Sequence, residues 1–289
     1  MNIIRRTYQK LSEGMYHVGI IAWEDLHYEL SPKLSDKVNW VKNAPKTSWY
    51  ADPFIFKVTD DEIHLFVEEK PYVSDNGVLS LMVIDRHSYR YLRSKVILQL
   101  STHLSFPYIM EVDGHTYVIP ENYQSGKSIS YLYDEVKEEL VFHKVLIEEP
   151  LTDAIYFEKK GQIHALSTRI EGCNGNVCRH YINGELYEEI LFPDNSARSA
   201  GHLFELEGKV YRPNQDCNGS YGRGVVLYEL SDTFEHKEKL RIFPTSKKYN
   251  MKFHTFNVGP KGYIAVDGFG YRYKVGYLLE KLKNLIKKN

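Results

Sequence analysis

Trp49-Tyr50-Ala51-Asp52-Pro53-Phe54-Ile55-Phe56 is the first copy of a pattern that returns about every fifty residues along the chain. Later copies begin near Pro107, Asp153, Gly201 and His254, and each runs through an apolar strand and a turn into a second apolar strand. Turns such as Asp113-Gly114 and Glu207-Gly208 indicate that these strands pair as hairpins. A repeat of roughly 40 to 50 residues with several strands is typical of propeller blades. The sequence therefore predicts an all-β fold, a five-bladed β-propeller.

The composition favours one closed domain over residues 1–276. With 289 residues, of which 43% are hydrophobic, the chain can bury a large core. The apolar run from Tyr16 to Ile21 has no local partner, so we expect it to close the ring by joining the last blade. The net charge of -1 argues against a nucleic-acid partner. Cys173, Cys178 and Cys217 lack a zinc-site spacing, which favours free thiols, and we expect no metal ligand set and no cofactor.

Residues 277–289 depart from the strand pattern. Leu278, Leu282, Leu285 and Ile286 fall on one stripe among several lysines, which predicts a short basic amphipathic helix. This helix either lies on the anionic inner surface of the membrane or packs against the propeller. No apolar run of signal-peptide or membrane-span length follows the N-terminus, so we expect a cytoplasmic protein with peripheral contact at the inner membrane.

The inner strands of a propeller converge on its axis, so equivalent positions of the repeat become neighbours. On this argument Asp52 is the candidate base or nucleophile, and Glu121 or Asp153 is the candidate acid. The alternative for Asp52 is a turn residue before Pro53, and the alternative for the other two carboxylates is exposure in loops. His254 is either a core histidine with backbone partners or a residue that holds a water molecule or an ion.

Polar residues are densest in the fourth repeat. Arg198 and Arg212 are predicted to hold a phosphate or carboxylate group, or else to pair with carboxylates across the axis. The predicted substrate-binding residues are Trp49, Glu69, Arg198, His202, Arg212, Gln215, Asp216 and His254.

Several of these motifs resemble the N-terminal domain of plant glucosamine inositolphosphorylceramide transferase. The resemblance is carried by residues 49–54, by Ala197-Arg198-Ser199-Ala200-Gly201 and by Tyr211-Arg212-Pro213-Asn214-Gln215-Asp216-Cys217, and it spans nearly the whole chain. It implies a five-bladed propeller, and free-standing bacterial relatives are associated with capsule, lipopolysaccharide and other surface-glycan assembly. In the plant protein a separate C-terminal glycosyltransferase domain follows.

A more distant resemblance is to the furanosidase-type five-bladed propellers of arabinanases and xylosidases. It implies a base at Asp52. Those enzymes place a second Asp on blade two and a Glu on blade three, where this chain has Pro107 and Asp153. Glu121 is the residue that could replace the missing acid.

The residues and the resemblances together predict a carbohydrate-active enzyme of cell-surface polysaccharide biosynthesis. It would transfer a glycosyl unit at the axis from a nucleotide-activated or lipid-linked sugar, alongside other glycan-assembly enzymes. One alternative is a non-catalytic sugar-binding or assembly module that partners a separate glycosyltransferase. The other is a furanosidase-type glycoside hydrolase.

Overall fold

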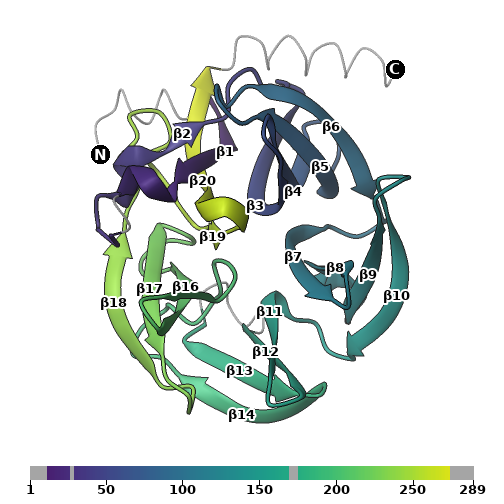
Figure 1. The fold of residues 1–289 in the computed structure, drawn as a ribbon, viewed down its shortest axis with the longest axis vertical. Helices are drawn as coiled ribbons and strands as arrows, with labels where there is room; N and C mark the ends of the chain where they lie inside the picture. The colour runs from purple at the N-terminus through teal and green to yellow at the C-terminus, as the bar shows by residue number, and fades with distance from the viewer. Residues whose placement is uncertain (1–11, 27–28, 169–174, 274–289) are drawn as a thin grey trace.

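The computed structural model describes residues 12–26, 29–168 and 175–273. Within them the chain forms five four-stranded sheets arranged around a central axis (Figure 1). The predicted five-bladed β-propeller is thereby confirmed. The predicted amphipathic helix at residues 277–289 lies outside the described residues. Among the described residues, no helix has the length and apolar character needed to cross a bilayer.

Each blade is an antiparallel sheet whose first strand lies next to the axis, as the hairpin pattern predicts. Blade one comprises β3 (Ser48–Val58), β4 (Glu62–Pro71), β5 (Val78–Asp85) and β6 (Tyr91–Leu98). Blade two comprises β7 (Ser105–Val112), β8 (His115–Glu121), β9 (Ser128–Asp134) and β10 (Glu139–Ile147). Blade three comprises β11 (Thr152–Lys159), β12 (Gln162–Thr168), β13 (Val177–Ile182) and β14 (Glu185–Leu191). Blade four comprises β15 (Phe204–Leu206), β16 (Lys209–Asp216), β17 (Gly224–Leu230) and β18 (His236–Ile242).

Blade five combines strands from both ends of the chain. Its order is β19 (Phe256–Val258), β20 (Tyr263–Tyr273), β1 (Ser12–Ala22) and β2 (Asn39–Trp40). The predicted ring closure is confirmed, because β1 pairs with β20 without a register shift, from Ser12 opposite Tyr273 to Ala22 opposite Tyr263. This pairing leaves no open edge between the first and last blades. Within the described ranges, four short 3-10 helices connect strands: Trp23–Leu26, Leu34–Lys37, Tyr123–Ser125 and Pro260–Gly262.

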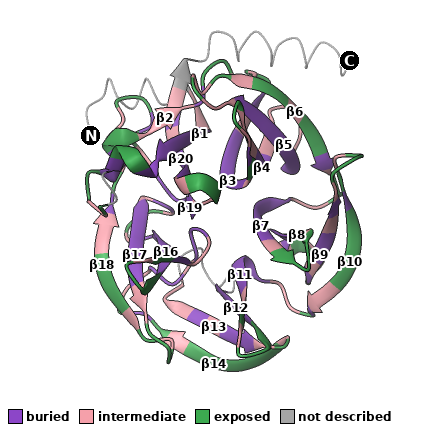
Figure 2. Cartoon of the chain, in the orientation of Figure 1, coloured by how far each residue is buried: buried purple, intermediate pink, exposed green. Residues whose placement is uncertain are grey.

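Apolar side chains fill the spaces between blades. Between blades one and two, for example, the ring of Phe54 packs edge-on against Phe106, and the ring of Phe66 packs edge-on against Tyr133. The inner strands are largely buried, whereas the outer strands β10, β14 and β18 are largely exposed (Figure 2). Burial on both faces explains why the inner strands read as continuous apolar runs.

A bulge with a left-handed residue interrupts the inner strand of three blades at the same place. Asp52, Phe106 and Asp153 have φ angles of 47°, 42° and 43°. Each coincides with a register shift between the first two strands of its blade. The sequence repeat equates Pro107 with the two aspartates, whereas the structure places Phe106 at the equivalent position. Left-handed φ angles are costly for residues other than glycine, so these positions store strain.

Gly201 lies at a tight contact between blades four and five, where there is no room for a β-carbon. A β-carbon there would lie 2.1 Å from the carbonyl oxygen of Phe256 and 2.3 Å from Oδ1 of Asn257. We expect Gly201→Ala to reduce the free energy of unfolding by about 1–3 kcal/mol. Thermal unfolding followed by circular dichroism measures the effect. Gly175→Ala is the control, because its β-carbon would come no closer than 3.9 Å to the nearest neighbouring atom. Equal melting temperatures for both variants would contradict the prediction.

Candidate functional site

Carboxylates from four blades meet at the bulged end of the axis. Asp52 and Asp153 lie at the bulges of blades one and three, Glu121 ends β8 of blade two, and Asp267 lies in β20 of blade five. Three of these residues are buried, and the Glu121 side chain is 11% exposed. The negative charge of Asp153 contributes to raising the pKa of both Asp52 and Glu121. The structure therefore brings the three predicted catalytic residues together.

Backbone amides connect these carboxylates from one blade to the next. The amide of Asp52 donates to Oδ2 of Asp267 at 3.1 Å, and the amide of Phe106 donates to Oδ2 of Asp52 at 3.2 Å. The amide of Asp153 donates to Oε2 of Glu121 at 3.0 Å. The three donors are the three bulge residues, whose amides the register shifts release from the strand ladder. The bulges thus convert strand pairing into contacts between blades.

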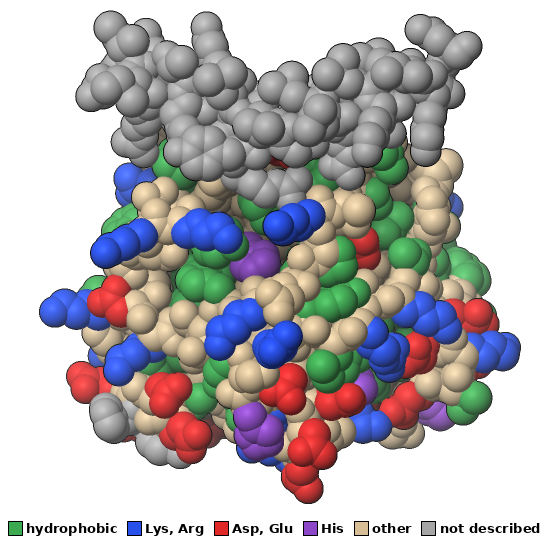
Figure 3. Space-filling view, turned by 90° about the horizontal axis from the view of Figure 1, so that it is seen from above, with side chains coloured by type: hydrophobic (Ala, Val, Ile, Leu, Met, Phe, Trp, Pro, Cys, Tyr) green, Lys and Arg blue, Asp and Glu red, His purple; other side chains and the backbone are tan. Residues whose placement is uncertain are grey.

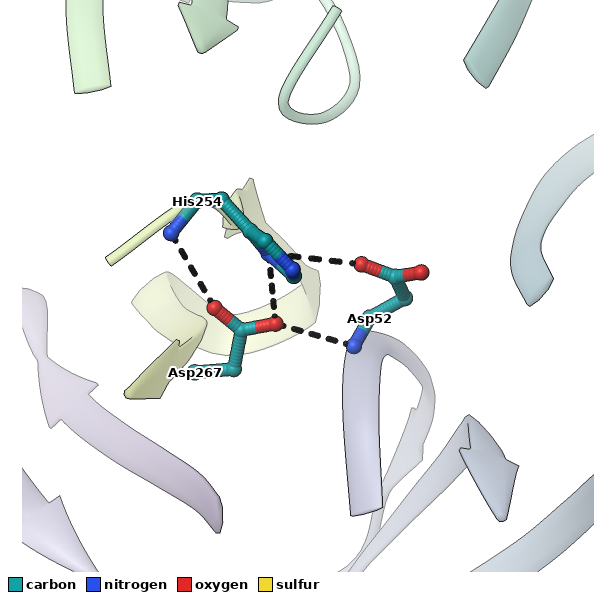
Figure 4. Close-up of side chains that lie close together, drawn as sticks. All are labelled: Asp52, His254 and Asp267. Carbon is teal, nitrogen blue, oxygen red and sulfur yellow. Dashed lines mark hydrogen bonds and ion pairs between the residues drawn. The ribbon is translucent and has the colours of Figure 1, made fainter. Parts of the chain in front are cut away.

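His254 lies between two of the carboxylates (Figure 4). Its Nδ1 is 2.8 Å from Oδ2 of Asp267 and 3.5 Å from Oδ1 of Asp52. The hydroxyl of Thr255 lies 2.9 Å and 3.0 Å from the same two oxygens. Burial alone would lower the pKa of His254, but the charge of Asp267 and then that of Asp52 outweigh it and raise the pKa to about 9. His254 is therefore a cation at neutral pH.

The two aspartates beside His254 titrate in opposite directions. Burial raises the pKa of Asp52 to about 7; the charge of His254 opposes this shift and that of Asp153 adds to it. Burial also acts to raise the pKa of Asp267, but the charge of His254 and the hydrogen bonds to Asp267 outweigh it, and the pKa is lowered.

Asp52, His254 and Asp267 are also the type of residues that bind metal ions. Their ligand atoms lie within 4.8 Å of one another. A metal ligand set requires a neutral imidazole and free carboxylate lone pairs. Here the histidine is protonated, and the Asp267 carboxylate already accepts hydrogen bonds from three backbone amides. The cluster therefore fits an ion-pair network better than a metal site.

Arg198 pairs with carboxylates across the axis, one of the two interpretations that its sequence position leaves open. Its Nε contacts Oδ2 of Asp153, and its Nη2 lies 3.2 Å from Oε2 of Glu121. Gln215, also from blade four, donates to Oδ2 of Asp153 at 2.5 Å. Burial, followed by the charge of Asp153, raises the pKa of Glu121 well above its usual value despite Arg198. We call Asp52, Glu121, Asp153, Arg198, His254 and Asp267 the axial cluster.

Arg212 and Asp216 do not belong to the axial cluster, contrary to the prediction. Arg212 is fully buried and donates to the carbonyl of Ala197 and the hydroxyl of Ser199, both at 3.0 Å. Asp216 accepts two hydrogen bonds from Arg223, each of 3.0 Å. These contacts lie within blade four. The reason is strand alternation, because neighbours in β16 point to opposite faces and only Gln215 is directed at Asp153.

Glu69 and Glu68 show the same alternation in β4. Glu69, a predicted binding residue, accepts hydrogen bonds from the hydroxyls of Ser48 and Ser80 at 2.7 Å and 2.8 Å, away from the axis. Its neighbour Glu68 is not a predicted binding residue, but its negative charge contributes to raising the pKa of Asp52. Oε1 of Glu68 lies 3.1 Å from Nε2 of His103. A one-residue error in the predicted face accounts for the difference.

His202 is likewise a packing residue. Its Nε2 donates to the carbonyl of Ile109 at 2.8 Å, and its ring contacts the rings of Phe54 and Tyr108. Burial lowers the pKa of His202 to about 4, so the ring is neutral. This side chain links blade four to blades one and two through the core.

Aromatic rings border the axial cluster. The ring of Tyr16 lies 4.5 Å from the ring of His254 and 5.4 Å from that of Trp49, a predicted binding residue. The Lys252 ammonium lies 5.0 Å from the centre of the Tyr221 ring. We call Tyr16, Trp49, Tyr221 and Lys252 the aromatic edge. Tyr16 could have been found from the ring-closing strand, whereas Tyr221 and Lys252 lie in loops that the repeat does not align.

The chain is similar in sequence to the N-terminal part of a plant transferase. The family model described as glucosamine inositolphosphorylceramide transferase 1, N-terminal, matches residues 37–252. Glucosamine inositolphosphorylceramide transferase 1 of Oryza sativa subsp. indica is 29% identical over 248 residues, 77% of this chain and 33% of the rice protein. The Arabidopsis thaliana protein of that name is 24% identical over 197 residues, 64% of this chain and 26% of that protein. The chain thus spans about a third of the length of the rice protein and about a quarter of that of the Arabidopsis protein.

Solved structures similar to this chain include glycoside hydrolases. A GH43_1 enzyme from Xanthomonas citri, complexed with xylotriose, has a TM-score of 0.56 and 8% identity, over 79% of this chain and 88% of that one. The family 117 glycoside hydrolase Zg3597 of Zobellia galactanivorans has a TM-score of 0.51 and 8% identity, over 89% and 90%. At this identity the likeness shows a common fold and nothing further.

The raised pKa of His254 predicts how stability depends on pH. The usual pKa of 6.5 rises to about 9 in the folded protein, so the stabilisation is fully present below pH 6.5 and is lost as the pH rises through 9. We expect the free energy of unfolding to fall by on the order of 3 kcal/mol across this window. Asp52 also has a raised pKa, but its contribution is lost at lower pH, between 3.8 and about 7.

Urea unfolding of the wild type and of His254→Gln, measured at several pH values, tests this. The variant should be less stable at the acidic end of the window, and the difference should shrink as the pH rises. A constant difference across the window would show that the charge of His254 does not stabilise the fold.

Proposed function

The chain belongs to the family of glucosamine inositolphosphorylceramide transferase 1 N-terminal domains, and we propose that it acts in glycosyl transfer, with a sugar bound at the axial cluster. The observation that carries the proposal is the meeting of three carboxyl groups from three blades, Asp52, Glu121 and Asp153, at one end of the axis. The pKa of Asp52 is raised to about 7, and that of Glu121 is raised well above its usual value. Raised pKa values of this kind are characteristic of catalytic acids and bases.

The proposed roles follow from these protonation states. Near pH 7 a substantial fraction of Asp52 is ionised, so it can take the proton of an acceptor hydroxyl as that oxygen forms the new bond to the sugar. The raised pKa of Glu121 favours its protonated form, which makes it the group proposed to donate a proton to the leaving oxygen as the old glycosidic bond breaks. Asp153 positions Glu121 and Arg198 through its own contacts. The rings of Trp49 and Tyr221, which are partly exposed, supply apolar faces against which a sugar can stack.

The names of the plant relatives support the substrate class. They are glucosamine inositolphosphorylceramide transferases, so we propose a lipid-linked acceptor and a nucleotide-activated donor for this chain. Assignment to capsule or lipopolysaccharide assembly, and a position at the inner membrane surface, are parts of the proposal that rest on the sequence alone.

A non-catalytic sugar-binding module is the second candidate. It is favoured by the fact that Arg198 and several backbone amides already engage the axial carboxylates. In this case the axial cluster would hold the blades together and present the aromatic edge to a glycan.

Asp52→Asn distinguishes the two candidates. It removes the proposed base at nearly constant shape, and we expect turnover to fall roughly 100-fold or more while sugar binding persists. The assay follows release of nucleoside diphosphate from a panel of nucleotide sugars, with sugar binding measured by saturation-transfer NMR. Glu69→Gln is the matched control, because it neutralises a carboxylate in blade one that faces away from the axis. Sugar binding without turnover in the wild type would leave the binding module as the function.

A further inference from the structure

A cavity lies beside the axial cluster, where blades five and one meet. It has a volume of about 450 Å³, within the usual range of small-molecule sites. Its walls come from β1, β2, the segment 41–46, the start of β3 and residues 248–249. We call it the side pocket. Its chemistry is set by His17, Trp40, Lys42, Lys46, Lys248 and Tyr249.

The lining of the side pocket is basic. Three lysines line it, and none of the described residues in its lining is Asp or Glu. Neither Lys42 nor Lys248 has a carboxylate partner within the described part of the chain, and both are exposed. Figure 3 looks onto this side of the propeller, where Lys and Arg side chains spread across the middle of the face and Asp and Glu gather towards its lower edge. Like charges around one cavity create a potential that attracts an anion.

One wall of the pocket is aromatic. The Trp40 and Tyr249 rings lie 4.5 Å apart, and the His17 ring stacks on Tyr249 at 4.9 Å. Burial lowers the pKa of His17 to about 4, and its Nε2 donates to the carbonyl of Val41, so this ring is neutral and fixed. Tyr249 is buried, whereas Trp40 is partly exposed and is the ring that a ligand can reach. The wall therefore suits a flat or apolar ring.

The basic side of the pocket is held in place by the fold. The amide of Lys42 donates to the carbonyl of Tyr89 at 2.8 Å, and its carbonyl accepts from the amide of Tyr91 at 2.9 Å. The amide of Val41 donates to the carbonyl of Val18 at 3.0 Å. Residues 41 and 42 are thus tied to blade five on one side and blade one on the other. A binding site with a fixed backbone loses little entropy when a ligand binds.

We propose that the side pocket binds a phosphate-bearing ring compound, either a nucleotide or a sugar phosphate. The ring would lie against Trp40, and the phosphate oxygens would accept hydrogen bonds from Lys42 and Lys248. A neutral sugar would leave the lysines unmatched, and an inorganic anion would leave the aromatic wall unused. The inference does not depend on the function proposed for the axis, because it rests on the charge and shape of a different cavity.

Isothermal titration of the full chain tests the inference with four probes: UDP, glucose-1-phosphate, uridine and pyrophosphate. We expect at least one ring-bearing phosphate to bind roughly tenfold or more tightly than uridine or pyrophosphate, because the latter two lose one of the two kinds of contact. UDP alone would identify a nucleotide site, and glucose-1-phosphate alone would identify a sugar-phosphate site. The proposal is overturned if neither UDP nor glucose-1-phosphate binds, or if pyrophosphate binds as tightly as they do.

Three variants locate the binding. Replacing Lys42 and Lys248 together by Gln should weaken the ring-bearing phosphate roughly tenfold or more. Lys144→Gln should not, because Lys144 lines a different cavity at blades two and three. Asp52→Asn should also retain this binding, which separates the side pocket from the axial cluster. Unchanged affinity in the double lysine variant would refute the site even if the ligand binds elsewhere.

Discussion

The structure depends on buried carboxylates that accept backbone amides from the next blade. A buried carboxylate costs several kcal/mol of desolvation unless hydrogen bonds and opposite charges replace its water. Asp267 receives the amide of Asp52, and Asp52 in turn receives the amide of Phe106. These bonds link blades five, one and two at the point where their inner strands come closest to the axis. The left-handed bulges cost about 1–3 kcal/mol each, and they persist because the released amides make these bonds.

The distance to the charge of His254 and then the number of hydrogen-bond donors explain why the pKa values of the two aspartates differ. Asp267 accepts three backbone amides and the closer contact of His254, and its pKa is lowered. Asp52 accepts one backbone amide, and His254 is 3.5 Å away, so burial dominates and the pKa rises to about 7. The contacts that join the blades therefore also set the protonation states on which a proton transfer would rely. A structural role and a catalytic role for this cluster are compatible.

The repeat predicted the blades, the ring closure by β1 and the meeting of Asp52, Glu121 and Asp153, because all three follow from strand order alone. It could not predict which neighbour faces the axis. The sequence predicts Glu69 at the axis, but it is Glu68 whose charge contributes to raising the pKa of Asp52. It predicts Asp216 together with Gln215, although the two side chains lie on opposite faces of β16. Strands β4 and β16 are buried on both faces, so their apolar pattern does not indicate which alternate residues face the axis. The roles proposed for the axial residues stay predictions.

Strand alternation also separates two kinds of chemistry at the junction of blades five and one. In β1, Tyr16 contacts His254 at the axial cluster, whereas Met15 and His17 line the side pocket. In β3, Trp49 contacts Tyr16, whereas Ser48 and Tyr50 line the pocket. The two sites therefore share their walls and differ in charge. At the axis, the cations Arg198 and His254 are already paired with carboxylates, which suits a neutral sugar. In the side pocket, the lysines suit a phosphate.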